Sequence, residues 1–161
     1  MSEKFIEVMS HLVSEMVKIS PRYSSDRAAR NGLNALIMTL CRNMEDVVPR
    51  NVSVKAAARG RELGVQDLRK FHFDHGGKIP GGRKKSMLHW EHWMPVAEMK
   101  KELLELVNPT PEECRKVLSK ARICWILKDE NDELDRRGFK SVRPDPESAY
   151  KISGIEFEYD W

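Results

Sequence analysis

The chain is 161 residues long, 33% of them charged and 40% hydrophobic, with a net charge of +3. A chain of this length can bury a real core in one domain, and no apolar run approaches the ~18 residues of a membrane-spanning helix. The charge is uneven, because residues 1–49 are neutral overall, residues 50–101 carry +7 and residues 102–161 carry −4. A basic middle segment predicts contact with a polyanion, although a solvated surface has the same composition.

The cellular compartment is predicted from the N-terminal residues and the cysteines. Residues 1–20 have the pattern of an amphipathic helix with glutamates rather than that of a signal peptide, so we expect a cytoplasmic protein with no membrane partner. Cys41, Cys114 and Cys124 form no C-x-x-C pair, which argues against a disulfide framework and against a cysteine-rich zinc site.

Two helices are expected before residue 50. Apolar residues recur at spacings of three and four from Phe5 to Val17, and Pro21 ends that pattern. A second, mostly apolar helix is expected from Arg27 to about Met44, with Ser25 or Asp26 as its N-cap. The segment "VVPRNVS" that follows has the composition of a linker.

Residues 53–70 have the pattern of a helix, a glycine turn and a shorter helix. Ser53 is a good N-cap for "VKAAARGREL", Gly64 follows as a C-cap would, and "VQDLRKF" begins the next helix. With Arg59 and Arg61, this segment is either a helix-turn-helix reader of DNA or a plain helical hairpin with solvated arginines. We expect residues 1–70 to form a helical part that reads DNA or dimerises, and residues 71–161 to form a second part.

The second part mixes loops, strands and helices. "HGGKIPGGRKK" is a glycine-rich basic loop, and "SMLHWEHWM" and "RICWIL" are predicted strands. Helices are expected between these strands over "AEMKKELLELV" and "TPEECRKVLSKA", and after them over "KDENDELDRRG". In the second of these helices Thr110 is the expected N-cap and Pro111 occupies the first helical position. Alternation in "IEFEYDW" indicates an edge strand. The expected fold class is α+β, mostly helical.

Two segments of the second part resemble the HNH, or ββα-metal, nuclease motif. "EHWMP" matches its acid-His-x-x-Pro start on a strand, and "WILKDEN" matches its second strand followed by a helix with an asparagine. The resemblance covers about residues 86–138. It implies a ββα-metal-like motif and says nothing about the N-terminal helices that precede it. The two strands of this motif are separated here by a helical insert, about Ala97–Lys120, where compact members of the family have a short loop. The implied activity is metal-dependent hydrolysis of DNA by a restriction-type or phage-related endonuclease.

The resemblance also implies roles for particular residues. Glu91 and Asn131 would hold a divalent ion, Mg²⁺ or Mn²⁺ rather than Zn²⁺, and His92 would be the general base that activates water. Further ligands or cleft residues are expected among His89, Glu130, Asp135, His72, Asp74 and His75, with Glu133 as another acid of the same helix. Phosphate contacts are expected from Arg83, Lys84, Lys85, Arg59, Arg61 and Arg122. A homodimer would suit a double-strand break, because one such site cuts one strand.

The same residues have structural interpretations. Adjacent residues of an ideal strand face opposite sides, so Glu91 and His92 share a site only if the strand ends or bends there. Otherwise His92 faces a core, Glu91 is an exposed strand residue, and Asn131 with its neighbouring acids charges a helix start. Three tryptophans are expected in the core rather than as stacking platforms for bases: Trp90, Trp93 and Trp125.

Other classes of function remain open on the sequence. His72-x-x-His75 and His89-x-x-His92 have ligand-like spacing for a four-histidine zinc site, or the first pair with Asp74 lines the same cleft as Glu91. A non-catalytic nucleic-acid-binding or inhibitor protein would use the basic segment and would bind DNA or RNA in a salt-sensitive way. A protein-interaction module would retain no DNA at low salt.

Overall fold

The structure is a computed structural model that describes residues 3–72 and 87–160. It is an α+β fold, mostly helical, with a small sheet, and the chain forms two compact units. Unit 1 comprises residues 1–48 and 94–121, and unit 2 comprises residues 49–93 and 122–161. The boundary expected at residue 70 lies inside unit 2. Over the described residues, every helix is too short or too polar to cross a membrane.

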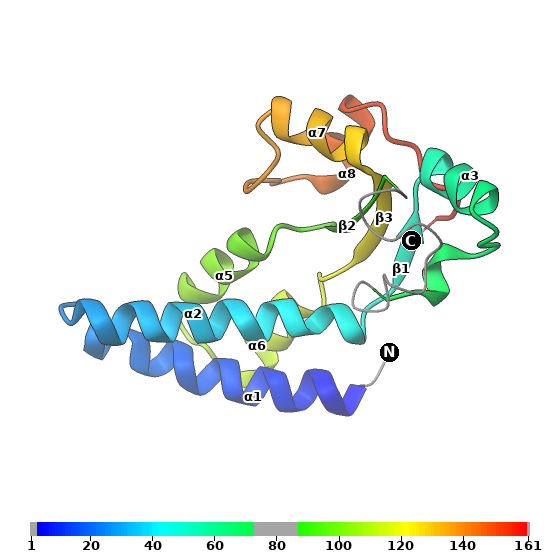
Figure 1. The fold of residues 1–161 in the computed structure, drawn as a ribbon. Coiled ribbons are helices and arrows are strands. Elements are labelled where there is room, and N and C mark those ends of the chain that lie inside the picture. Colours follow the sequence, from blue (N-terminus) through cyan, green and yellow to red (C-terminus); the bar gives the residue numbers. More distant parts are fainter. Residues whose placement is uncertain (1–2, 73–86, 161) are drawn as a thin grey trace. The chain divides into compact units, whose positions relative to one another are not determined.

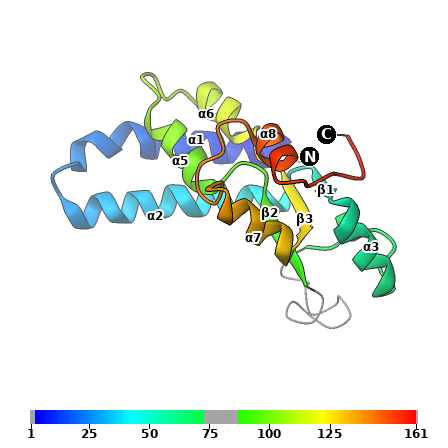
Figure 2. The same cartoon turned by 90° about the horizontal axis from the view of Figure 1, so that it is seen from above.

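Unit 1 is built from helices. The long helices α1 (Glu3–Ile19) and α2 (Arg27–Asn43) form a hairpin joined by the 3-10 turn η1 (Ser20–Tyr23), as Figures 1 and 2 show. Helix α6 (Pro111–Leu118) packs against α1, and α5 (Val96–Leu104) packs against α2. A second 3-10 turn, η2 (Met44–Asp46), ends α2. The two halves of the unit therefore come from segments that are about fifty residues apart along the chain.

The expected helix starts of unit 1 are confirmed. The Asp26 carboxylate accepts hydrogen bonds from the amides of Ala28 at 2.9 Å and Ala29 at 3.0 Å, so Asp26 is the N-cap of α2. The Thr110 hydroxyl accepts from the Glu113 amide at 3.2 Å, and Pro111 occupies the first helical position of α6. Both caps satisfy amide groups that the first turn of a helix leaves without a partner.

Unit 2 contains a three-stranded sheet in the order β1-β3-β2. Strand β3 (Ile123–Leu127) pairs in parallel with β1 (Arg50–Val52) and antiparallel with β2 (Leu88–His92). The antiparallel register joins Glu91 to Cys124 and His92 to Ile123. Among the described residues of the unit, the helices are α3 (Val54–Glu62), α7 (Lys128–Arg136) and α8 (Pro146–Ile152), with a 3-10 turn, η3 (Leu68–Lys70).

The two faces of this sheet have different contents. On one face, Cys124 and Ile126 form a core with Leu134 of α7, Tyr150 of α8 and Ile155. Figure 1 shows α7 and α8 on one side of the strands and α3 on the other. The opposite face carries the Trp90–Trp125 pair, whose ring centres are 4.9 Å apart. The expectation of buried tryptophans is confirmed for both of these residues, whereas Trp93 is half-buried.

Three sequence-based expectations were wrong. The expected linker contains β1, which lies beside the buried strand β3 although only three of its residues pair. The second helix expected after Gly64 is the single 3-10 turn η3, so a helix-turn-helix does not form there. The expected edge strand over "IEFEYDW" makes only an isolated bridge between Phe157 and Ser53 among the described residues.

Candidate functional site

Glu91 and His89 form a carboxylate–imidazole pair on β2. Glu91 Oε2 lies 3.2 Å from His89 Nε2, and the side chains are 14% and 38% exposed. Their cross-strand partners are Cys124 and Ile126, so alternation puts both on the sheet face that α7 and α8 cover. The pair is thus partly buried but reachable from solvent.

Arg143 fixes the other oxygen of this carboxylate. Its Nη2 donates to Glu91 Oε1 at 2.5 Å, and the Arg143 side chain is only 1% exposed. Its Nη1 donates to the His92 carbonyl at 2.8 Å and to the Tyr150 hydroxyl at 2.9 Å, while Nε donates to the Phe139 carbonyl at 2.7 Å. Arg143 therefore orients Glu91 and ties β2 to the segment after α7, leaving Oε2 directed at His89.

The charges in this cluster favour an ionised Glu91. Burial raises the pKa of the Glu91 carboxyl, but the hydrogen bond from His89 and the charge of Arg143 outweigh it and hold that pKa below its ordinary value of 4.5. Burial also raises the pKa of the Tyr150 hydroxyl well above its ordinary value, so Tyr150 stays protonated beside Arg143. At neutral pH the cluster is a carboxylate held between a cation and an imidazole.

The structure separates His92 from Glu91. Strand β2 remains paired through His92, which is opposite Ile123, so the two adjacent side chains face opposite sides of the sheet. His92 is on the face of Trp90, where the buried His72 ring lies 5.1 Å from the Trp90 ring. The imidazole that accompanies Glu91 is His89, because it is two residues away on the same strand.

The candidate residues of α7 have different surroundings. Glu130 is buried, and its Oε2 accepts from the Ser53 hydroxyl at 2.6 Å and from the Leu127 amide at 2.8 Å, so it caps α7 and joins it to α3. Asn131 is half-buried on a helix that packs against β2. Asp135 pairs with Lys140 at 2.8 Å, and Glu133 pairs with Arg136 at 2.7 Å.

The expected phosphate contacts are partly described. Arg59 forms an ion pair with Glu62 at 2.8 Å, and Arg61 forms one with Glu158 at 2.7 Å. Arg122 is half-buried at the start of β3, where its carbonyl accepts a hydrogen bond. The other predicted contact and cleft residues lie outside the described residues: Asp74, His75, Arg83, Lys84 and Lys85.

Potential metal ligands are few around Glu91 among the described residues. Within residues 3–72 and 87–160, no three His, Cys, Asp or Glu side chains are grouped closely enough to hold a metal ion. Mg²⁺ is commonly bound through one or two carboxylates while waters complete its shell, whereas a structural zinc ion takes four protein ligands. The Glu91–His89 pair supplies one carboxylate and one imidazole, which is fewer ligands than a structural zinc ion takes.

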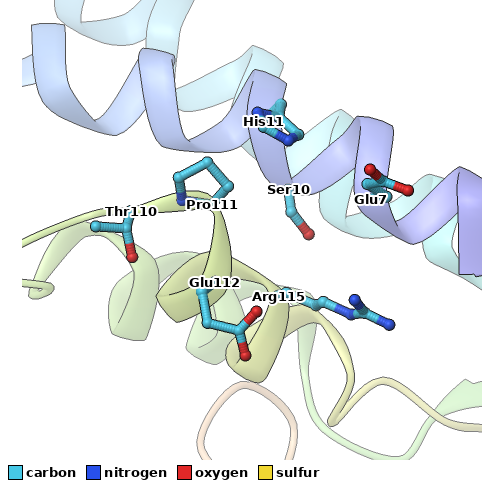
Figure 3. Close-up of a pocket in the computed structure, with 7 residues that line it drawn as sticks. All are labelled: Glu7, Ser10, His11, Thr110, Pro111, Glu112 and Arg115. Atoms are coloured by element: carbon cyan, nitrogen blue, oxygen red, sulfur yellow. The ribbon is translucent and has the colours of Figure 1, made fainter.

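Unit 1 has a separate polar cavity of about 360 Å³ between α1 and the start of α6. Figure 3 shows Glu7, Ser10 and His11 of α1 opposite Thr110, Glu112 and Arg115. Ser10 is already bonded to the Ile6 carbonyl at 2.6 Å, and Thr110 caps α6. Ser10 and Thr110 therefore already have hydrogen-bond partners within the helices.

The chain matches no protein family, no curated protein and no solved structure at a significant level. Of the residues in the Glu91 cluster, Arg143 and Tyr150 were not predicted from the sequence, because an arginine between Val142 and Pro144 lies in no periodic pattern and no motif.

Proposed function

We propose that the protein is a divalent-metal-dependent endonuclease that cleaves DNA, with the His89–Glu91 pair at its centre. The observation that carries the proposal is a carboxylate oxygen 3.2 Å from an imidazole nitrogen, on a strand whose antiparallel neighbour leads directly into α7. The order of strand, strand and helix resembles that of the ββα-metal nucleases and supports the proposal, although here α5 and α6 come between the two strands.

Each residue of the pair has a chemical task in this proposal. Glu91 Oε2 and the Asn131 amide would hold a hydrated Mg²⁺ or Mn²⁺, which would offset negative charge on the pentavalent phosphorus and the leaving oxygen. His89 would take the proton of the attacking water, since a neutral imidazole is a base near physiological pH. Arg143 positions the Glu91 carboxylate, as outer-shell partners of metal ligands commonly do. The general base is thus assigned to His89 rather than to His92.

The test is cleavage of supercoiled plasmid and of modified and unmodified phage DNA, with Mg²⁺, Mn²⁺ or EDTA. We expect cutting that requires the metal and that falls roughly 100-fold or more in His89→Ala, because general base catalysis contributes about 10²–10⁴-fold. His11→Ala is the matched control, since His11 is an exposed histidine of unit 1. Loss of cutting in His92→Ala alone would move the base to His92, and DNA left intact by the wild type under every metal would overturn the nuclease proposal.

A second candidate is a nucleic-acid-binding protein without catalysis. It is favoured by the bond from Arg143 to Glu91 Oε1, which gives this carboxylate a structural partner, together with the +7 charge of residues 50–101. Binding would then weaken steeply with salt because neutralised phosphates release counterions. Salt-sensitive binding in a gel-shift assay, with no cleavage and no effect of His89→Ala, would select this candidate.

A further inference from the structure

Unit 2 also has a cavity, which lies beside the Glu91 cluster and is lined by aromatic rings. Its volume is about 430 Å³, and its lining includes Trp93, Phe157 and Tyr159, with Tyr150 and Ile155 at its buried side. Three charged residues complete the lining: Glu147, Lys151 and Asp160. The proposed nuclease chemistry leaves this cavity unused.

The rings are held in place by their neighbours. Trp93 stacks on Tyr150 with ring centres 4.6 Å apart and planes 10° apart, and Phe157 meets both rings at 5.4 and 5.2 Å. The Arg69 guanidinium lies 3.6 Å from the centre of the Tyr159 ring, and Asp67 anchors that guanidinium at 2.9 Å. The cavity wall is therefore a preformed aromatic surface, which loses little conformational freedom when a flat ligand binds.

Charge and size select the class of ligand. A small ammonium ion would leave most of 430 Å³ empty and would meet the Lys151 ammonium group. A phosphate would meet the Glu147 and Asp160 carboxylates. A flat, neutral heterocycle with amino and carbonyl groups on its edge suits aromatic walls with carboxylates and an ammonium at the rim, because carboxylates accept from exocyclic amines and lysine donates to carbonyls.

We propose that this cavity binds a nucleobase, packed against the rings of Trp93, Phe157 and Tyr159, and that in the proposed nuclease the base is an extrahelical one of the bound strand. Arg143 links the cavity to the Glu91 pair, since it donates to Glu91, to the Tyr150 hydroxyl and to the Trp93 carbonyl. The extrahelical source rests on the proposed function, whereas base binding itself does not. Stacking on aromatic side chains is how proteins hold single unstacked bases.

The test is binding in EDTA, where cleavage is absent, to a 20-base-pair duplex with one unpaired nucleotide. We expect the full-length protein to bind the bulged duplex roughly tenfold more tightly than the same duplex with an abasic bulge, by fluorescence anisotropy. Tyr159→Ala should remove most of this preference, and Tyr159→Phe should keep it. Tyr23→Ala is the matched control, because Tyr23 and Tyr159 are 44% and 43% exposed and Tyr23 lies in unit 1.

The outcomes separate this inference from the proposed function. Equal affinity for the base-bearing and abasic bulges, with no binding of nucleoside monophosphates by ligand-observed NMR, would overturn base binding even if plasmid cleavage were found. Tighter binding of the base-bearing bulge without any plasmid cleavage would support base binding in this cavity and would count against the proposed nuclease activity. Binding of free monophosphates with no bulge preference would keep the base as ligand but assign it to a free nucleotide.

Discussion

Arg143 connects three parts of unit 2 through one side chain. It donates to the Glu91 carboxylate and the main chain of β2, to the Phe139 carbonyl after α7, and to the Tyr150 hydroxyl of α8. A buried guanidinium is stable only while such partners remain, because removing one member of a buried ion pair leaves an unpaired charge. At the scale of single residues, the geometry of the candidate site therefore depends on a residue that is not expected to touch the substrate.

Replacing Arg143 by methionine should lower the free energy of unfolding by about 3–5 kcal/mol at pH 7, since Glu91 would keep its charge without its main partner. The measurement is urea unfolding in metal-free buffer followed by circular dichroism. Arg136→Met is the control, because Arg136 is 68% exposed and its pair with Glu133 should contribute at most about 1 kcal/mol. Equal losses in the two variants would contradict the structural role of Arg143.

The difference in unfolding free energy between the wild type and Arg143→Met should shrink in acid. The pKa of Glu91 is held below 4.5 in the folded wild type, so the stability that this carboxylate contributes is present above that pH and is lost as the pH falls through the folded pKa. In Arg143→Met the buried Glu91 carboxyl should take up its proton at a higher pH than in the wild type. Protonation removes the unpaired buried charge, so the variant loses less stability in acid. A gap between wild type and variant that stays constant from pH 7 to pH 4 would argue against this account.

At the scale of elements, the sequence correctly predicted those helices and strands that have strong local signals. The caps Asp26 and Thr110 and the aromatic strand of residues 88–92 were all predicted, because capping and alternation are local. Strand β1 was missed, since its three residues follow a proline and are held by partners far along the chain, in β3 and at residues 158–159. The pairing of His89 rather than His92 with Glu91 was also missed, because it depends on how far β2 continues.

Two glycines inside helices should respond to alanine in opposite ways. A Cβ at Gly60 of α3 would lie 2.9 Å from Cγ of the buried Leu68, whereas a Cβ at Gly32 of α2 would meet nothing within 4 Å. We expect Gly60→Ala to lose about 1–2 kcal/mol of unfolding free energy, because overpacking costs more than helix propensity returns. Gly32→Ala should gain about 0.5–1 kcal/mol. Thermal unfolding measures both, and stabilisation by Gly60→Ala would show that Leu68 moves freely.

At the scale of the whole molecule, the chain leaves unit 2 after Trp93 and returns at Arg122. These two positions are joined within unit 2 by a hydrogen bond from the Trp93 amide to the Arg122 carbonyl at 3.0 Å. Trp93 and Arg122 are therefore as close as the two ends of a β-hairpin, and a two-residue turn is long enough to connect them in place of residues 94–121.

A shortened chain should fold without unit 1. Residues 49–93 joined by Asn-Gly to residues 122–161 should give a cooperative urea transition, because the sheet and its α7–α8 core lie within these residues. Deleting only residues 1–48 is the contrasting variant. It should expose the buried Leu103 and Leu118 of α5 and α6, and increase binding of a hydrophobic dye. A shortened chain with no cooperative transition would show that unit 2 requires unit 1.

Strand β1 is bonded to residues made long after it. Asn51 Nδ2 donates to the Tyr159 carbonyl at 2.7 Å, and the Glu158 amide donates to the Val52 carbonyl at 3.0 Å. During synthesis on the ribosome, β1 must therefore wait for more than a hundred further residues before its last partners exist. In that interval its main chain is open to chaperones or to the strands of another nascent chain. The yield of folded protein in a cell should thus respond to the speed of translation across residues 60–160.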